Sequence, residues 1–341
     1  MLIYVLRRLA TIPFILFAVT LMIVTLLQFI PIESRAASFI TKPNQLNQLQ
    51  AIIKEKGLDK PFWVQYGSWL SSALKGNLGY SKTSNEPVLE TIQKRLPASL
   101  ELGLYSGLVV IGLGIWIGTR AALQKNGLLD RVSGILAVAG YSLPSFVLGI
   151  WLLMVFYGAL GIAPAPGRLS QENEILLVTG AVKRFTGMLT IDALLSGQWA
   201  VLWDALAHLV LPVITLSVFS TATILKAMRS SLIEVLGSDF IRTARAKGLS
   251  EAIVNIKHAR RNALLPITAL STGVILGLIG GSVIVESIFA FPGIGSWVAR
   301  ASSGLDYPAV LGFALLSAII IVIANLIVDL LYGILDPRVR L

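Results

Sequence analysis

Residues 9–30, LATIPFILFAVTLMIVTLLQFI, carry no charge and decide the class of the fold. As a helix this stretch is about 33 Å long, which matches the hydrocarbon thickness of a bilayer. Arg7 and Arg8 precede it as in a signal peptide, but the apolar stretch is too long for one. We therefore interpret it as a retained first membrane span.

The rest of the chain continues this apolar character. Of its 341 residues, 55% are hydrophobic and only 13% are charged, and the mean hydropathy of +0.79 excludes an ordinary soluble domain. Further spans are predicted at residues 100–123, 132–160, 205–225, 264–289 and 309–331. The sequence therefore predicts an all-α, polytopic membrane protein with six transmembrane helices.

The net charge of +10 has two possible explanations, a nucleic-acid partner or the charge bias of membrane loops. The second explains where the cations lie, because the short loops on one side of the predicted spans are rich in cations, whereas the short loops on the other side hold only Arg168, Lys183, Arg184 and Arg300. The basic side is expected to be cytoplasmic. Both termini are then cytoplasmic, and no nucleic acid is expected. These cations are Arg120, Lys125, Arg131, Lys226, Arg229, Arg242, Arg245, Lys247, Lys257, Arg260 and Arg261.

Three parts follow from this topology. Residues 1–30 form the N-terminal end and first span, residues 31–98 form an extracytoplasmic loop or cap, and residues 99–341 form a core of five spans with a cytoplasmic loop at 226–263. Within the cap, helical spacing predicts one helix over residues 46–56, ending at Gly57, and another over residues 61–74.

Catalytic chemistry of its own is not expected from this chain. It lacks the G-x-x-x-x-G-K-[ST] phosphate loop, so any ATP hydrolysis must take place on a partner. It has no cysteine, and its two histidines, His208 and His258, lie on opposite sides of the predicted membrane, which leaves no metal cluster. A secondary transporter or channel remains an alternative, although we find no inverted repeat and few acids within the spans.

The cytoplasmic loop has the pattern of a helical hairpin. Ser238 or Asp239 can cap a first helix, Gly248 can end it in a left-handed turn, and Ser250 can start a second helix. Its small residues, Ala244 and Ala246, would let a partner approach closely. Two interpretations remain open: the hairpin inserts into a groove of a partner protein, or it is a solvated basic loop on lipid headgroups.

This loop resembles the coupling motif of ABC-importer permeases, in the variant of the oligopeptide, dipeptide and nickel permease family. Ala244, Gly248, Leu265 and Pro266 match the general motif, whereas Arg242, Thr243 and Ala263 depart from it as the peptide subfamily does. The order of the blocks resembles the first, B-type permease of that family. The other matching blocks are residues 4–8, 57–61, 76–81, 95–97, 142–146, 291–295 and 336–338.

The resemblance implies a type I importer permease fold in a bacterial inner membrane. It implies as partners a second homologous permease, two ATPase subunits that bind ATP and Mg, and an extracytoplasmic substrate-binding protein, while this chain binds no cofactor. Cargo is expected to be peptide, with a nickel chelate or an oligosaccharide as alternatives. The implied ATPase-coupling residues are Asp239, Arg242, Thr243, Ala244, Arg245, Ala246, Lys247, Gly248, Leu249 and Ser250.

Glycines at four-residue spacing in the fifth span, Gly273, Gly277 and Gly281, form one small-residue stripe. This stripe is either a pore-lining or inter-subunit face or a site of packing within the chain, and Gly114 with Gly118 in the second span pose the same choice. Glu286, near the outward end of the fifth span, either lines the translocation path or is an interfacial carboxylate.

Overall fold

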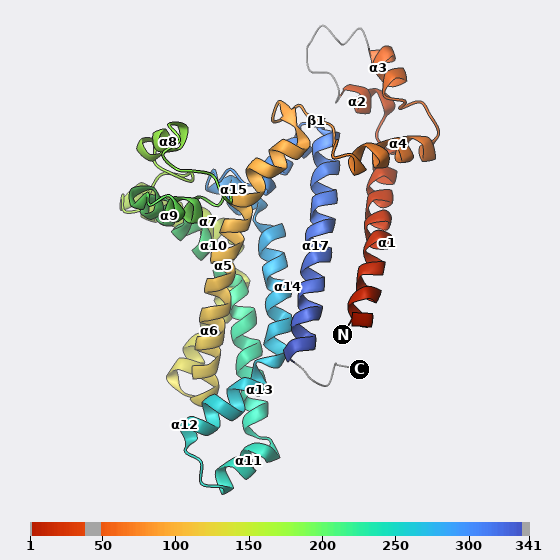
Figure 1. The fold of residues 1–341 in the computed structure, drawn as a ribbon. Coiled ribbons are helices and arrows are strands. Elements are labelled where there is room, and N and C mark those ends of the chain that lie inside the picture. Colours follow the sequence, from red (N-terminus) through yellow and green to blue (C-terminus); the bar gives the residue numbers. More distant parts are fainter. Residues whose placement is uncertain (1, 38–48, 336–341) are drawn as a thin grey trace. The chain divides into compact units, whose positions relative to one another are not determined.

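The computed structural model describes residues 2–37 and 49–335, and these residues are almost entirely helical (Figure 1). The strands of this described part are β1 (Tyr80–Ser81) and β2 (Glu86–Pro87), which form one short antiparallel pair. Tyr80 lies opposite Pro87 in their register. The predicted all-α class is confirmed.

The chain folds into two compact units. One unit contains Met1–Ser99 and Pro292–Leu326, and the other contains Leu100–Phe291 and Ile327–Leu341. Helices α5 (Val88–Leu123) and α17 (Tyr307–Leu335) contribute residues to both.

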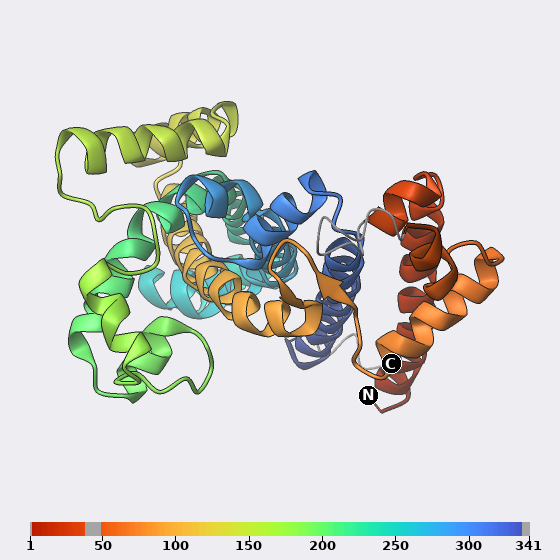
Figure 2. The same ribbon diagram turned by 90° about the horizontal axis from the view of Figure 1, so that it is seen from above.

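In the first unit, short helices gather at the end of α1 that lies away from the N-terminus (Figures 1 and 2). The buried Thr20 and Tyr66 hydroxyls bond at 2.9 Å and fix α4 against α1. Gly57 has a φ of 64° and ends α3, as predicted, although residues 46–48 of the predicted helix lie outside the described residues. The elements are α1 (Leu2–Leu27), α2 (Ile32–Ala37), α3 (Leu49–Glu55) and α4 (Phe62–Leu74).

Asp306 joins the strand pair to the start of α17. Its buried carboxylate accepts hydrogen bonds from Ser81 Oγ at 2.7 Å and from the Thr83 amide at 2.9 Å. A carboxylate at this position also suits the positive end of the helix dipole. Helix α16 (Ile294–Ser303) packs beneath, and the apolar core here consists of Val88, Ile92, Ile294, Trp297, Val298, Ala301 and Ala309.

The second unit is organised around α10 (Trp199–Leu236), a long helix that contacts most of its neighbours. An ion pair between Arg229 and Asp130, with Nη2 and Oδ2 2.8 Å apart, holds the start of α6 against it. The neighbouring elements are α6 (Leu128–Ser142), α7 (Ser145–Leu152), the π-helical η2 (Leu153–Ala159), α8 (Gln171–Val178), α9 (Leu189–Leu195), α14 (Leu265–Gly281) and α15 (Val283–Ile288).

Four helices in the described part are individually long and apolar enough to cross a membrane: α1, α5, α10 and α17. The predicted span at 132–160 is not one straight helix, because α6 and α7 meet at a bend of 99°. Pro144 explains the break, since a proline favours extended backbone in the residue before it, and Leu143 has φ −95° and ψ 117°. The predicted span at 264–289 is likewise divided at Ser282, so a total of six spans stays a prediction.

Candidate functional site

The loop after α10 folds into the predicted helix–turn–helix. Helix α11 (Asp239–Ala246) ends at a turn in which Gly248 has a φ of 78°, and the second arm begins after Ser250. Left-handed backbone at Gly248 was predicted and is confirmed. The second arm contains α12 (Glu251–Ile253), the π-helical η3 (Val254–Arg260) and α13 (Arg261–Ala263).

The helix starts differ from the prediction in one detail. Ser238 and Ser250 hold the positions before α11 and α12, but neither side chain makes a capping hydrogen bond. Ser238 Oγ instead donates to the Val235 carbonyl at 2.6 Å. The hydroxyl therefore joins α11 to the end of α10 rather than satisfying the first amides of α11.

An ion pair across the turn holds the two arms together. Arg245 Nε donates to Glu251 Oε1 at 2.7 Å, and its Nη2 donates to Oε2 at 3.2 Å, so that the guanidinium and the carboxylate pair through two bonds. This contact holds the pKa of Glu251 below its ordinary value and raises that of Arg245. The sequence analysis did not include Glu251, whose only signal was an acid in the first turn of the second arm.

The hairpin has an inner and an outer face. Ile241 and Ala244 are buried, so Ala244 packs within the hairpin and is not available to a partner, contrary to the expectation for its small side chain. Phe240 is 47% exposed on the outer face, and the sequence analysis did not include it. The remaining predicted coupling residues are exposed except for Leu249, which is half-buried: Asp239, Arg242, Thr243, Arg245, Ala246, Lys247, Gly248 and Ser250.

The base of the hairpin is fastened to the long helix from which it emerges. Ser231 Oγ in α10 donates to the Ala263 carbonyl in α13 at 3.0 Å. Val254, Ala259 and Ala263 are buried, so the second arm packs against the protein along its length. The second arm of the hairpin is therefore attached to α10 before the chain continues into α14.

The glycines of the two predicted stripes have different surroundings. A Cβ at Gly118 would lie 2.7 Å from the Leu225 carbonyl oxygen, so this glycine serves close packing of α5 on α10. A Cβ at Gly273 or Gly277 would meet no atom within 4 Å. The surroundings of Gly281 lie outside the described residues.

Gly273 and Gly277 line an apolar groove of about 740 Å³. Its other walls come from the bend between α6 and α7, including Pro144, and from α10, including Thr215 and Phe219. The groove therefore lies between the bend of α6 and α7 on one side and Gly273 and Gly277, called here the open glycine stripe, on the other. Glu286 is not among its lining residues, because this carboxylate is fully buried and accepts a hydrogen bond from Ser282 Oγ at 2.7 Å.

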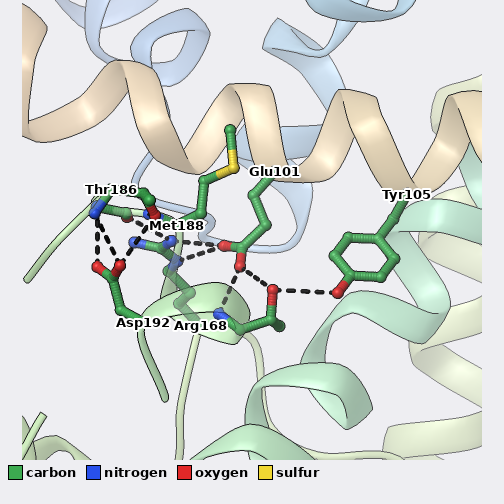
Figure 3. Close-up of polar contacts among 8 residues, drawn as sticks. Glu101, Tyr105, Arg168, Thr186, Met188 and Asp192 are labelled. Atoms are coloured by element: carbon green, nitrogen blue, oxygen red, sulfur yellow. Dashed lines mark hydrogen bonds and ion pairs between the residues drawn. The ribbon is translucent and has the colours of Figure 1, made fainter. Parts of the chain in front are cut away.

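A polar cluster organises the loop between η2 and α10 (Figure 3). Glu101 is buried in α5, and its Oε2 accepts from Arg168 Nη2 at 2.5 Å, while its Oε1 accepts from the amide of Thr190 at 2.7 Å. Asp192 accepts from the amides of Thr186 and Gly187. These acids hold the fold of the loop, and their separation in sequence explains why the pairing was not predicted.

Two known protein families together match nearly the whole chain. The family described as "Binding-protein-dependent transport system inner membrane component" matches residues 111–341. Its companion family, described as "Binding-prot-dependent transport system membrane comp, N-term", matches residues 1–103.

Named relatives are similar over their full length. The dipeptide transport system permease protein DppB of Escherichia coli K12 is 38% identical over 100% of this chain and 99% of its own. The DppB protein of Alkalihalophilus pseudofirmus is 36% identical over 100% of both chains. The di/tripeptide permease DppB of Pseudomonas aeruginosa is 38% identical over 100% of this chain and 99% of its own.

Proposed function

The chain belongs to the binding-protein-dependent transport system inner membrane component family, and from this membership we propose that it is a channel-forming permease subunit of an ATP-driven peptide importer. The apolar helices place it in the membrane. The peptide cargo rests on its relatives, which are dipeptide and di/tripeptide transport permeases.

The observation that carries the mechanism is the hairpin fastened at its base. An exposed surface around Phe240, Arg242 and Lys247 would dock in a groove of an ATPase subunit, with the aromatic ring as an apolar anchor. The exposed ring and cations alone would also suit lipid headgroups, and it is the membership of this transport family that favours the protein-groove interpretation. ATP and Mg would bind on the partners, and closure of the ATPases would pull on α10 and α14 through the Ser231–Ala263 bond.

A second permease subunit is proposed to cover the open glycine stripe. Gly273 and Gly277 leave room for the close approach of another helix, and no described atom of this chain fills that room. Two such subunits would enclose a pore between them, with a substrate-binding protein delivering peptide on the outer side. Both termini would then be cytoplasmic, in agreement with the basic inner loops.

Affinity purification from detergent-solubilised native membranes, followed by reconstitution, tests this function. We expect a second permease and two ATPases to copurify, and we expect uptake of a labelled dipeptide into proteoliposomes to require both ATP and the binding protein. Uptake by this chain alone without ATP would instead establish a secondary carrier. ATP-dependent uptake of a nickel chelate or an oligosaccharide in place of peptide would correct the cargo.

A further inference from the structure

A small cavity lies in the first unit, where α2 and α4 meet the ends of α1 and α17. Its volume is about 200 Å³, and it lies beside Leu27, where the apolar stretch of α1 ends. If α1 and α17 cross the bilayer, this level is that of the lipid headgroups, where aromatic side chains such as Trp69 and Tyr307 are common.

Hydrogen-bond donors dominate the polar lining of this cavity. Arg35 and Lys56 are cationic, and Tyr307 and Ser68 carry hydroxyls. No lining residue in the described part of the chain is acidic. Lys56 is an exposed rim residue that pairs with Glu55, so Arg35 and Tyr307 are the important groups.

Tyr307 is the most informative of these groups. Its side chain is buried, and within the described residues its hydroxyl has no hydrogen-bond partner. A buried polar group that makes no bond costs about 1–3 kcal/mol, so such a group is usually satisfied by a ligand or by water. Arg35 donates through Nη1 to the amide oxygen of Gln65 at 3.1 Å, which orients the guanidinium in the cavity lining. Burial also lowers the pKa of Arg35 from its ordinary value.

An apolar groove of about 520 Å³ continues along the same two helices. On α1 its lining residues, Ile15, Val19 and Ile23, follow a four-residue spacing that reaches Leu27 at the polar cavity. On α17 the groove is lined by the large side chains of Val310, Phe313 and Ile321 and by small side chains that include Ala314. A donor-rich pocket with an apolar channel below it is complementary to a phosphate group with an attached acyl chain.

We propose that this pocket and groove bind one phospholipid, with its phosphate held by Arg35 and Tyr307 and an acyl chain lying between α1 and α17. The guanidinium and the phenol both donate to phosphate oxygens, as is usual for such groups. The lipid would fill the space between two helices that bury little of their own apolar surface, since only 11% of the α1 span is buried. This inference is independent of the cargo and of the transport function.

The test measures lipid retained by the purified, assembled complex. Native mass spectrometry should find one tightly held phospholipid per chain after delipidation, and Tyr307→Phe or Arg35→Gln should lower its retention at least about fivefold. Tyr105→Phe is the matched control, because it removes a hydroxyl that bonds to Thr190 in the other unit and should leave retention unchanged. Ala314→Phe should block the groove and release the lipid while the polar pocket stays intact.

Several outcomes would overturn the proposal. A wild-type complex that holds no lipid would do so, as would Tyr307→Phe and Arg35→Gln complexes that retain as much lipid as wild type. If inorganic phosphate binds in a manner that depends on Arg35 and Tyr307, and Ala314→Phe has no effect on lipid, the site is one for a free anion. Thermal unfolding of each variant, compared with wild type, separates loss of lipid from loss of fold.

Discussion

Arg245 and Glu251 face each other across the turn at Gly248 and pair through two hydrogen bonds of 2.7 and 3.2 Å. The pair closes the tip of the hairpin, whereas the bond between Ser231 and Ala263 closes its base. A surface restrained at both ends can dock without first losing much conformational freedom. This geometry leads to the first two predictions.

Gly248→Asp should weaken docking of the ATPases. Gly248 has a φ of 78°, a conformation that costs most side chains about 1–2 kcal/mol and Asp less, so the main effect is the charge added to the proposed contact. We expect about a tenfold loss of copurified ATPase with normal membrane insertion. Gly180→Asp is the control, because Gly180 has a φ of 77° and open surroundings but lies in the α8–α9 loop. Equal loss in both variants, or in neither, would contradict a role of the hairpin.

The ion pair of Glu251 should depend on pH with a definite sign. Arg245 lowers the pKa of Glu251, so the contribution of the pair is complete above the unfolded pKa, about 4.3, and is lost as pH falls through the lower folded pKa. In a titration of ¹³C-labelled glutamate carboxyls, the Glu251 signal should shift at higher pH in Arg245→Gln than in wild type. An unchanged titration would show that the pair does not persist in solution.

Glu101→Gln should destabilise the outer loop of the second unit. It replaces a buried carboxylate and leaves the Arg168 guanidinium without its counter-charge, at a cost of about 2 kcal/mol. We expect a lower unfolding temperature in detergent. Glu172→Gln provides the comparison, because Glu172 is an exposed acid in the same loop and its loss should have no measurable effect.

The two glycine stripes should respond differently to added side chains. Gly118→Ala places a methyl group against the Leu225 carbonyl oxygen and Met228, and it should lower the free energy of unfolding by about 2 kcal/mol. Gly277→Ala meets open space and should not destabilise the isolated chain. Thermal unfolding of both variants tests this contrast.

A larger side chain tests what covers the open stripe. Gly277→Phe should leave the isolated chain folded but reduce the copurified second permease severalfold, because the ring would occupy the space for the partner helix. Retention of the partner at the wild-type level would show that this face does not form the interface.

Local backbone chemistry accounts for what could be predicted from the sequence. Apolar length identified α1 and α10, and the turn at Gly248 follows from the conformational freedom of glycine. Contacts between residues distant in sequence could not be predicted in this way. The pairing of Glu101 with Arg168 depends on how the outer loop folds back onto α5.

The direction in which a side chain points was the other property that could not be predicted from the sequence. Ala244 and Ala246 both look like small surface residues in the sequence, but a helix turns about 200° over two positions, so only Ala246 is exposed. The bend at Pro144 was missed although its signal was present, because hydropathy alone treats residues 132–160 as continuous.

The bond between Ser231 and Ala263 has a consequence for exchange of the hairpin between permeases. It encloses residues 232–262, because it joins Ser231, near the end of α10, to Ala263, the last residue of α13. If the hairpin docks on an ATPase as proposed, changes of sequence inside that segment would alter which ATPase is recognised while this attachment to α10 stays in place. The hairpin would in this sense be a replaceable adaptor, whose choice of ATPase is set separately from the choice of cargo in the pore.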